Sequence, residues 1–306
     1  MTVARVDPLS GSSAGLAPER DRVDAALERA VARIAQGLPA DVHAAAAHGV
    51  LGGGKRLRPL LCVCAYEACG GESHSALYDL AAAIEMIHAY SLMHDDLPCM
   101  DDADLRRGLP TTHRKHGEDA TMRAGAALIP AAALQAWSAS TALGHPVAHA
   151  RRITALLLEA AGAGGMVGGQ WADLLAEGRA LESAELDALH RRKTGALLAA
   201  SLVIGALAAD AAEPVVEALR EYGEAVGLAF QIADDILDAT QAAETLGKNP
   251  SDAALGKSTY VALHGLEAAE ARAKAEVARA VRALDRAGVS APRLVALAEY
   301  VVARER

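Results

Sequence analysis

The core of this chain has to be built from small and aliphatic side chains, because large aromatic ones are nearly absent. Apolar residues make up 52% of the 306 residues, yet aromatic residues make up only 3%, and Phe230 is the single phenylalanine. Strands favour aromatic and β-branched residues, whereas helices favour alanine and leucine. The composition therefore argues against an all-β fold, and the high apolar fraction argues against a disordered chain.

Signals for helix starts recur along the chain and predict one all-α domain. They are Pro18, Pro59, Ser75, Ser183, Pro214 and Pro292. Gly and Pro breaks between them predict roughly ten to twelve helices. No stretch alternates like a strand for long, and no fixed-period repeat is found. We expect a flexible tail over residues 1–17 and a single helical bundle over residues 18–306.

Charge and hydropathy narrow the classes of partner. The formal net charge is −9, so nonspecific binding to nucleic acid is disfavoured. Residues 124–150 and 195–209 contain no Asp, Glu, Lys or Arg, but the first run is interrupted by Pro and polar residues and the second is too short to span a bilayer. We interpret both as core or subunit-interface helices. Unpaired cysteine spacing and the lack of a signal-peptide pattern favour a reducing, cytoplasmic location.

A first acidic cluster follows His94. Its carboxylates are Asp95, Asp96, Asp101, Asp102 and Asp104. On a straight helix Asp95 and Asp101 would lie about 120° apart, but Pro98 interrupts the helix and lets them converge. Crowded carboxylates repel one another unless a hard cation lies between them, and Mg²⁺ is the usual one beside phosphate. The alternative is a solvated acidic loop.

A second acidic cluster contains Asp234, Asp235 and Asp238. Asp234 and Asp238 are four residues apart, so they share one face of a helix that is otherwise apolar. Charges on such a helix are costly unless they face a polar cavity or a metal ion. The alternative is a pair of aspartates at a helix end.

Basic residues are grouped around these clusters. They are Lys55, Arg56, Arg58, Arg106, Arg107, Lys193, Lys248 and Lys257. Arginine forks and lysine ammonium groups are the side chains that hold diphosphates. Acidic clusters with Mg²⁺ and separate basic clusters together would suit two diphosphates, one held through metal and one held directly by cations.

In this order the motifs resemble those of the trans-isoprenyl diphosphate synthases, in particular the bacterial farnesyl and geranylgeranyl diphosphate synthases. The matching segments are 53–59, 88–96 continuing to 108, 193–196, 227–238, 246–248 and 256–259. The resemblance implies an isoprenoid synthase bundle with a central active-site cavity, a Mg²⁺-dependent prenyltransferase and a homodimer. Its substrates would be isopentenyl diphosphate and an allylic diphosphate.

The resemblance also implies a role for each matching residue. Mg²⁺ would be held by Asp95, Asp101 and Asp234, with Asp96, Asp235 and Asp238 in support. Arg106, Lys193 and Lys257 would hold the allylic diphosphate. Isopentenyl diphosphate would be held by Lys55, Arg58, His88 and Arg107. Thr194 and Gln231 would face the developing carbocation, and Lys248 would help to close the site.

The product length depends on the floor of the cavity. Tyr90, followed by Ser91, lies about 7.5 Å before Asp95 along a helix, where the resemblance places an aromatic stop typical of farnesyl (C15) formation. Ala103, Ala126 and Ala233 depart from the usual pattern, and a geranylgeranyl (C20) product stays open. A class I terpene cyclase, a non-catalytic partner subunit and a purely structural bundle are competing interpretations. We expect a C15 synthase.

Overall fold

A computed structural model describes residues 15–240 and 258–303, and these are almost entirely helical, so the predicted all-α class is confirmed. The N-terminal helices are α1 (Ala17–Ile34), α2 (Ala40–Leu51), α3 (Leu57–Ala68), α4 (Ser75–Asp95), α5 (Thr112–His116) and α6 (Glu118–Ala142). They are followed by α7 (Val147–Ala161), α8 (Met166–Ala176), α9 (Ser183–His190), α10 (Ala196–Ala208), α11 (Glu213–Thr240), α13 (Tyr260–His264), α14 (Leu266–Arg286) and α15 (Pro292–Ala303).

Three short elements interrupt this pattern. A 3₁₀ turn, η1 (Ala35–Gly37), follows α1, and a π-helical turn, η2 (Arg191–Gly195), joins α9 to α10. An antiparallel hairpin pairs β1 (Leu105–Arg106) with β2 (Leu109–Pro110). No sequence pattern indicated this hairpin, because its strands are only two residues long.

Local sequence accounts for where several helices begin. Pro18 lies in the first turn of α1, and α15 begins at Pro292, where a missing backbone N–H costs no hydrogen bond. The predicted start of α9 at Ser183 is also found. Its capping box, however, is formed one residue earlier by Glu182, together with Glu185.

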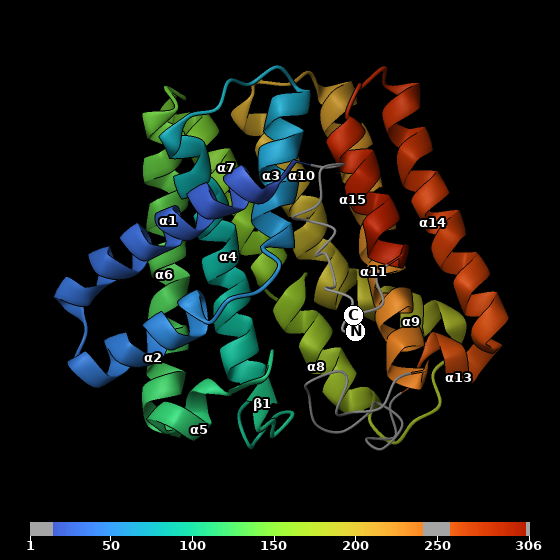
Figure 1. The fold of residues 1–306 in the computed structure, drawn as a ribbon, viewed down its shortest axis with the longest axis horizontal. Coiled ribbons are helices and arrows are strands. Elements are labelled where there is room, and N and C mark those ends of the chain that lie inside the picture. Colours follow the sequence, from blue (N-terminus) through green and yellow to red (C-terminus); the bar gives the residue numbers. More distant parts are fainter. Residues whose placement is uncertain (1–14, 241–257, 304–306) are drawn as a thin grey trace, which may run out of the picture.

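The centre of the molecule is α10, which packs against α3, α7 and α11 (Figure 1). Every residue from Leu197 to Ala208 is buried. The uncharged run at 195–209 is therefore a core helix within this chain, and it supplies no surface for a subunit interface. The other uncharged run covers most of α6, which continues through Pro130, and extends into the first turn of α7. No helix in the described ranges has both the length and the hydropathy needed to cross a membrane.

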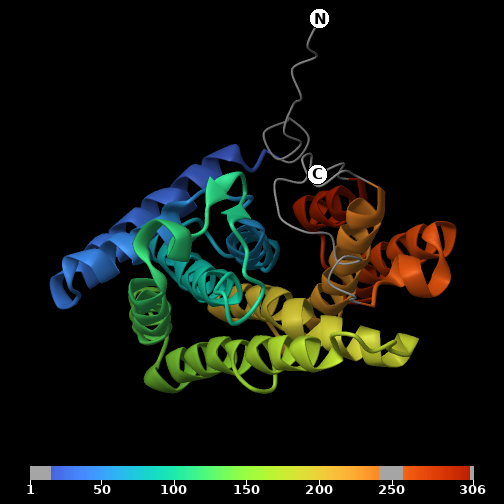
Figure 2. The same cartoon turned by 90° about the horizontal axis from the view of Figure 1, so that it is seen from below.

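The bundle has two walls. Figure 2 shows α1 to α6 on one side and α11 to α15 on the other, joined by the segment from α7 to α10. Helix α4 ends at Asp95, and α11 carries Asp234 to Asp238 in its last two turns. Both acidic motifs lie toward the lower end of the bundle in Figure 1.

Small residues allow the central helices to approach each other closely. A Cβ atom added to Gly223 of α11 would lie 2.5 Å from the backbone Cα of Ala199 in α10. Backbone atoms cannot move aside as the end of a side chain can, so this crossing requires glycine. A core made mainly of Ala and Leu is matched to such short distances between helix axes.

We predict that Gly223→Ala lowers the free energy of unfolding by about 1–2 kcal/mol. In an open helix this change would add up to about 1 kcal/mol of stability through helix propensity, whereas overpacking costs about 1–3 kcal/mol. Urea unfolding at fixed protein concentration measures the difference. Glu224→Ala, on the exposed neighbour, should stay within about 0.5 kcal/mol of the parent. A Gly223→Ala protein more stable than the parent would contradict the packing described here.

Candidate active site

The first acidic cluster is shaped by the end of α4. The helix ends at Asp95, before Pro98, because the residue preceding a proline avoids helical geometry. The chain then folds back, and the backbone N–H of Asp101 donates to the carbonyl of Asp95 at 2.8 Å. Asp102 adopts left-handed geometry at φ 46° in this turn. The turn brings Asp101 back to Asp95, as we expected from Pro98.

The surroundings of Asp95 disfavour its ionised carboxylate unless a cation lies beside it. Burial raises the pKa of Asp95 to about 7; Asp101 and Asp96 act in the same direction, and Lys193 and Arg106 oppose the shift. The carboxylate also lies at the C-terminal end of α4, where the helix dipole is negative. A divalent cation here would favour the ionised form of the carboxylate, so the donor set fits Mg²⁺.

Asp96 has a different partner. Its buried carboxylate accepts from Arg106 Nε at 2.8 and 3.0 Å, and Arg106 Nη2 donates to the same group. Arg106 is carried by β1 of the hairpin. These paired hydrogen bonds fix the orientation of the Arg106 guanidinium. We therefore assign Asp96 to holding Arg106 in place, in preference to direct metal binding.

A basic group forms where α3, α4 and the hairpin meet. Burial lowers the pKa of Arg58 to about 10; Arg107 acts in the same direction, whereas Glu85 and Asp234 oppose the shift. Burial, together with Arg58 and Arg107, holds the pKa of His88 well below its usual value. Arg58, His88 and Arg107, predicted to bind one diphosphate, therefore lie within electrostatic range of one another. Asp234 on α11 lies within range of this group.

The loop before α3 holds the basic group in place. Arg56 has left-handed backbone geometry, at φ 52°, and is buried. Its guanidinium pairs with Glu85 at 3.0 Å and with Asp24 at 2.8 Å, so it acts in packing and not as a free cation. Arg107 Nη1 donates to the carbonyl of Gly53 in the same loop. Lys55 Nζ lies 5.6 Å from the ring centroid of Tyr300 on α15.

Lys193 and Thr194 lie in the π-turn η2. Such turns widen the helix by one residue and are frequent at functional sites. Thr194 Oγ1 donates to Gln231 Oε1 at 2.7 Å, which joins two residues that we predicted to face the substrate. Lys193 Nζ forms an ion pair with Asp173 on α8.

Glycines allow neighbouring helices to reach this turn. A Cβ atom on Gly169 of α8 would lie 2.3 Å from the backbone N of Lys193. A Cβ atom on Gly227 of α11 would lie 2.8 Å from the Cα of Gly195. The absence of side chains at these positions brings α8 and α11 against η2, next to the residues expected to contact substrate.

In the second acidic cluster, the aspartates have separate surroundings. Asp235 is buried and accepts from the backbone N–H of Tyr260 at 2.8 Å, and its Oδ2 lies 4.0 Å from His190 Nε2. It therefore holds the start of α13 against α11. Asp234 and Asp238 are one helical turn apart on α11, which makes them the pair that can face a common ligand.

Two residues of α8, Asp173 and Gln170, were not among those expected from the sequence. Asp173 is the one charged residue of this helix, and an isolated charge on an otherwise apolar helix was the available signal. Gln170 is buried, and neither polar atom of its amide has a hydrogen-bond partner among the described residues. Lys248 and Lys257, which we expected to act on the substrate, lie outside the described residues.

Comparison with known proteins identifies the family of the chain. Residues 40–291 match the polyprenyl synthetase family. The chain is 44% identical over 275 residues to geranylgeranyl pyrophosphate synthase 11 of Arabidopsis thaliana, covering 87% of this chain and 75% of that protein. It is 40% identical over 291 residues to a dimethylallyltranstransferase of Fischerella ambigua, covering 94% and 82%.

Solved structures show the same fold. An FPP/GFPP synthase from Zymomonas mobilis is 34% identical, with a TM-score of 0.76 and coverage of 93% of this chain and 98% of that one. A geranyltransferase from Helicobacter pylori, complexed with magnesium and isoprenyl diphosphate, is 29% identical, with a TM-score of 0.77 and coverage of 98% of both chains. The chain therefore belongs to the polyprenyl synthetase family and is a short-chain trans-prenyltransferase with the isoprenoid synthase fold.

Proposed function

We propose that this enzyme condenses isopentenyl diphosphate with dimethylallyl and geranyl diphosphates, uses Mg²⁺, and releases farnesyl diphosphate. The observation that carries the proposal is the set of charges between α4 and α11. Asp95 lies within electrostatic range of Lys193, and Asp234 lies within range of Arg58. Each acidic motif thus has a basic group beside it, as two neighbouring diphosphates would require.

Mg²⁺ would be held by Asp95 and Asp101 on one wall and by Asp234 and Asp238 on the other. When bound, it neutralises the charge that develops on the departing diphosphate. Asp96 and Asp235 are assigned to support, because their observed partners are Arg106 and the backbone of Tyr260.

The chain's own cations would hold the two diphosphates. Lys193 and Arg106 bind the allylic diphosphate, and their carboxylate partners Asp173 and Asp96 fix their positions. Arg58, Arg107 and a neutral His88 bind isopentenyl diphosphate, with Lys55 at the edge. Preorganised cations of this kind act where charge develops and need not rearrange during the reaction.

Cleavage of the allylic carbon–oxygen bond leaves an allylic cation. The hydroxyl of Thr194 is held by Gln231, so the oxygen atoms of this pair are fixed where they can stabilise the cation. The double bond of isopentenyl diphosphate then attacks the cation, and loss of a proton to the departed diphosphate restores an alkene. Aliphatic surroundings contain few nucleophiles that could trap the cation.

Tyr90 supports a C15 product. Its side chain is buried one and a half turns before Asp95 on α4, and its hydroxyl donates to the carbonyl of Ala161 in α7 at 3.4 Å. The ring also packs edge-on against His94, with centroids 5.8 Å apart. A ring fixed at both ends can block a growing chain. Ser91 donates to the carbonyl of His88, so it is turned back along its own helix.

A C20 product is the second candidate, favoured by the relatives in Arabidopsis thaliana that carry the name geranylgeranyl pyrophosphate synthase. Incubating the purified protein with isopentenyl diphosphate and each allylic diphosphate, with and without Mg²⁺, and determining product length separates the two. A Mg²⁺-dependent C15 product supports the proposal, and C20 overturns the role of Tyr90. No product from any pair would favour a non-catalytic partner subunit.

Asp95→Asn and Asp234→Asn should each lower turnover by at least about 10²-fold, because each removes charge from the proposed metal site. Steady-state rates in Mg²⁺ measure the loss, and circular dichroism checks that the fold is retained. Asp102→Asn is a matched control, because this exposed residue of the same turn pairs with Arg114. Near-normal rates for either first variant would refute the metal assignment.

Tyr90→Ala should lengthen the product, because it removes the ring that blocks the chain. Chromatography of the products with geranyl and farnesyl diphosphate as substrates gives the length distribution. Tyr78→Ala removes an equally buried ring from the same helix, about 18 Å further from Asp95 for 12 residues, and should leave the product unchanged. An unchanged product from Tyr90→Ala would place the floor of the cavity elsewhere.

We also propose a homodimer formed through the outer faces of α6, α7 and α8. Leu134, Val147 and Trp171 on these helices are exposed at 68%, 70% and 63%. Light scattering should give the mass of two chains, and Leu134→Glu with Trp171→Glu should shift it towards one. Leu266→Glu, on the exposed start of α14, is the control. A parent protein with the mass of one chain would refute this proposal.

A further inference from the structure

Two pairs of side chains face each other where the segment of α9 and η2 packs against α11. In the first pair, Thr194 Oγ1 donates to Gln231 Oε1 at 2.7 Å. The second pair is His190 and Asp235, which lie four residues before Thr194 and four residues after Gln231. The two segments therefore run antiparallel, and the second pair lies about one helical turn from the first, roughly 6 Å along α11.

His190 is a buried histidine that makes no hydrogen bond within the described ranges. Its side chain is 8% exposed, and neither ring nitrogen has a hydrogen-bond partner among the described residues. The ring is held by stacking on Tyr260, with centroids 5.7 Å apart and 22° between the two planes. A buried polar group without a hydrogen bond costs free energy, so its presence at this position needs a reason.

Asp235 offers His190 an acceptor that is just out of reach. His190 Nε2 lies 4.0 Å from Asp235 Oδ2, about 1 Å beyond hydrogen-bond distance. The same oxygen accepts from the backbone N–H of Tyr260 at 2.8 Å, and a carboxylate oxygen has room for a second donor. Burial lowers the pKa of His190 to about 4, against the opposing effect of Asp173. The ring is therefore neutral, and it has one N–H to donate.

The neighbours of this pair are residues assigned above to the allylic diphosphate and its metal ion. Lys193 follows His190 by three residues, and Asp234 directly precedes Asp235. A ligand that contacts both Lys193 and the metal site at Asp234 draws η2 and α11 together. We infer that His190 then donates to Asp235, and that this bond locks η2 and α11 at the spacing the bound ligand requires. The inference rests on the proposed function, because it uses the diphosphate site assigned there.

His190 is thus a positioning residue, which acts through Asp235 and Lys193 and does not touch the substrate. The bond between Thr194 and Gln231 is present without ligand, whereas the bond between His190 and Asp235 forms only when ligand is bound. An interaction that exists only in the bound state strengthens binding and adds nothing to the stability of the free protein. This difference separates a positioning role from a structural one.

His190→Phe removes the donor and keeps a ring that can stack on Tyr260. Without ligand, its melting temperature at fixed protein concentration should equal or exceed that of the parent, because no hydrogen bond is lost. With Mg²⁺ and an unreactive allylic diphosphate analogue, its melting temperature should rise less than that of the parent. Calorimetry should show the Kd of the analogue increased at least about tenfold, as expected for one hydrogen bond to a charged group. His190→Gln keeps a donor and should recover part of the affinity.

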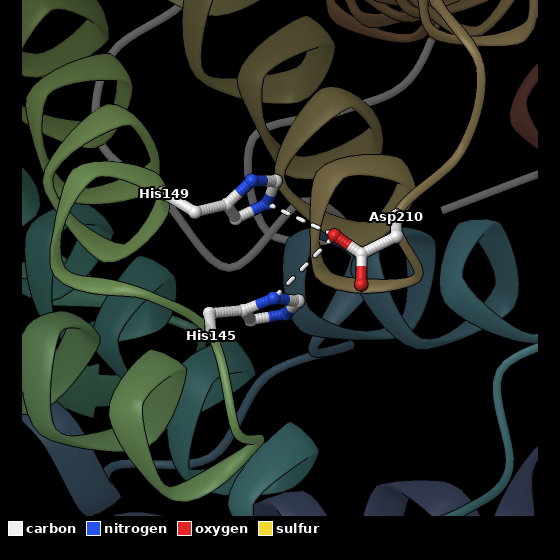
Figure 3. Close-up of side chains that lie close together, drawn as sticks. All are labelled: His145, His149 and Asp210. Atoms are coloured by element: carbon white, nitrogen blue, oxygen red, sulfur yellow. Dashed lines mark ion pairs between the residues drawn. The ribbon is translucent and has the colours of Figure 1, made fainter.

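His145→Phe is the matched control, because His145 is a comparably buried histidine that already has a hydrogen bond. Its Nε2 lies 3.0 Å from the carbonyl of Ala208, and its Nδ1 lies 3.5 Å from Asp210 Oδ1 (Figure 3). Without ligand, this variant should melt at a lower temperature than the parent, because a buried carbonyl loses its donor. It should bind the analogue with the affinity of the parent.

Two results would overturn the inference alone. One is a His190→Phe protein that binds the analogue as tightly as the parent. The other is a His190→Phe protein that, without ligand, loses as much melting temperature as His145→Phe. A parent protein that does not bind the analogue in Mg²⁺ would instead refute the proposed function on which the inference rests.

Discussion

Negative charge buried at the end of α4 is the constraint on which the rest of the site depends. Burial, with two neighbouring carboxylates, raises the pKa of Asp95 to about 7, and the helix dipole acts in the same direction. The nearby cations are themselves held by other carboxylates, Lys193 by Asp173 and Arg106 by Asp96. The carboxylates between α4 and α11 therefore need further positive charge to neutralise them. A divalent ion that arrives with a diphosphate would supply that charge.

The packing of small residues makes this charge arrangement possible. Gly169 and Gly227 let α8 and α11 approach the π-turn that carries Lys193 and Thr194. Gly223 and Ala199 let α11 cross α10 at a short distance. With few aromatic side chains to separate the helices, α8 and α11 lie directly against the turn that carries two of the proposed substrate-binding residues.

Much of this could be predicted from the sequence. The lack of aromatic residues indicated an all-α fold, Pro98 indicated the turn that returns Asp101 to Asp95, and the spacing of Asp234 and Asp238 indicated a shared face. The fork between Asp96 and Arg106 and the pair of Asp173 with Lys193 could not be predicted, because they depend on how separate elements pack. The sequence Arg-Arg-Lys-Thr-Gly contains no signal for a π-turn. The role of Asp235 could not be predicted either, because its partner Tyr260 lies 25 residues further along the chain.

Anomalous diffraction from crystals grown with Mn²⁺ and an unreactive allylic diphosphate analogue tests the central claim most directly. Mn²⁺ replaces Mg²⁺ at oxygen sites and can be located by its own signal. We predict Mn²⁺ peaks between the analogue and Asp95 and Asp101 on one side, and between the analogue and Asp234 on the other. A diphosphate held by Lys193 and Arg106 with no Mn²⁺ at either acidic motif would contradict it.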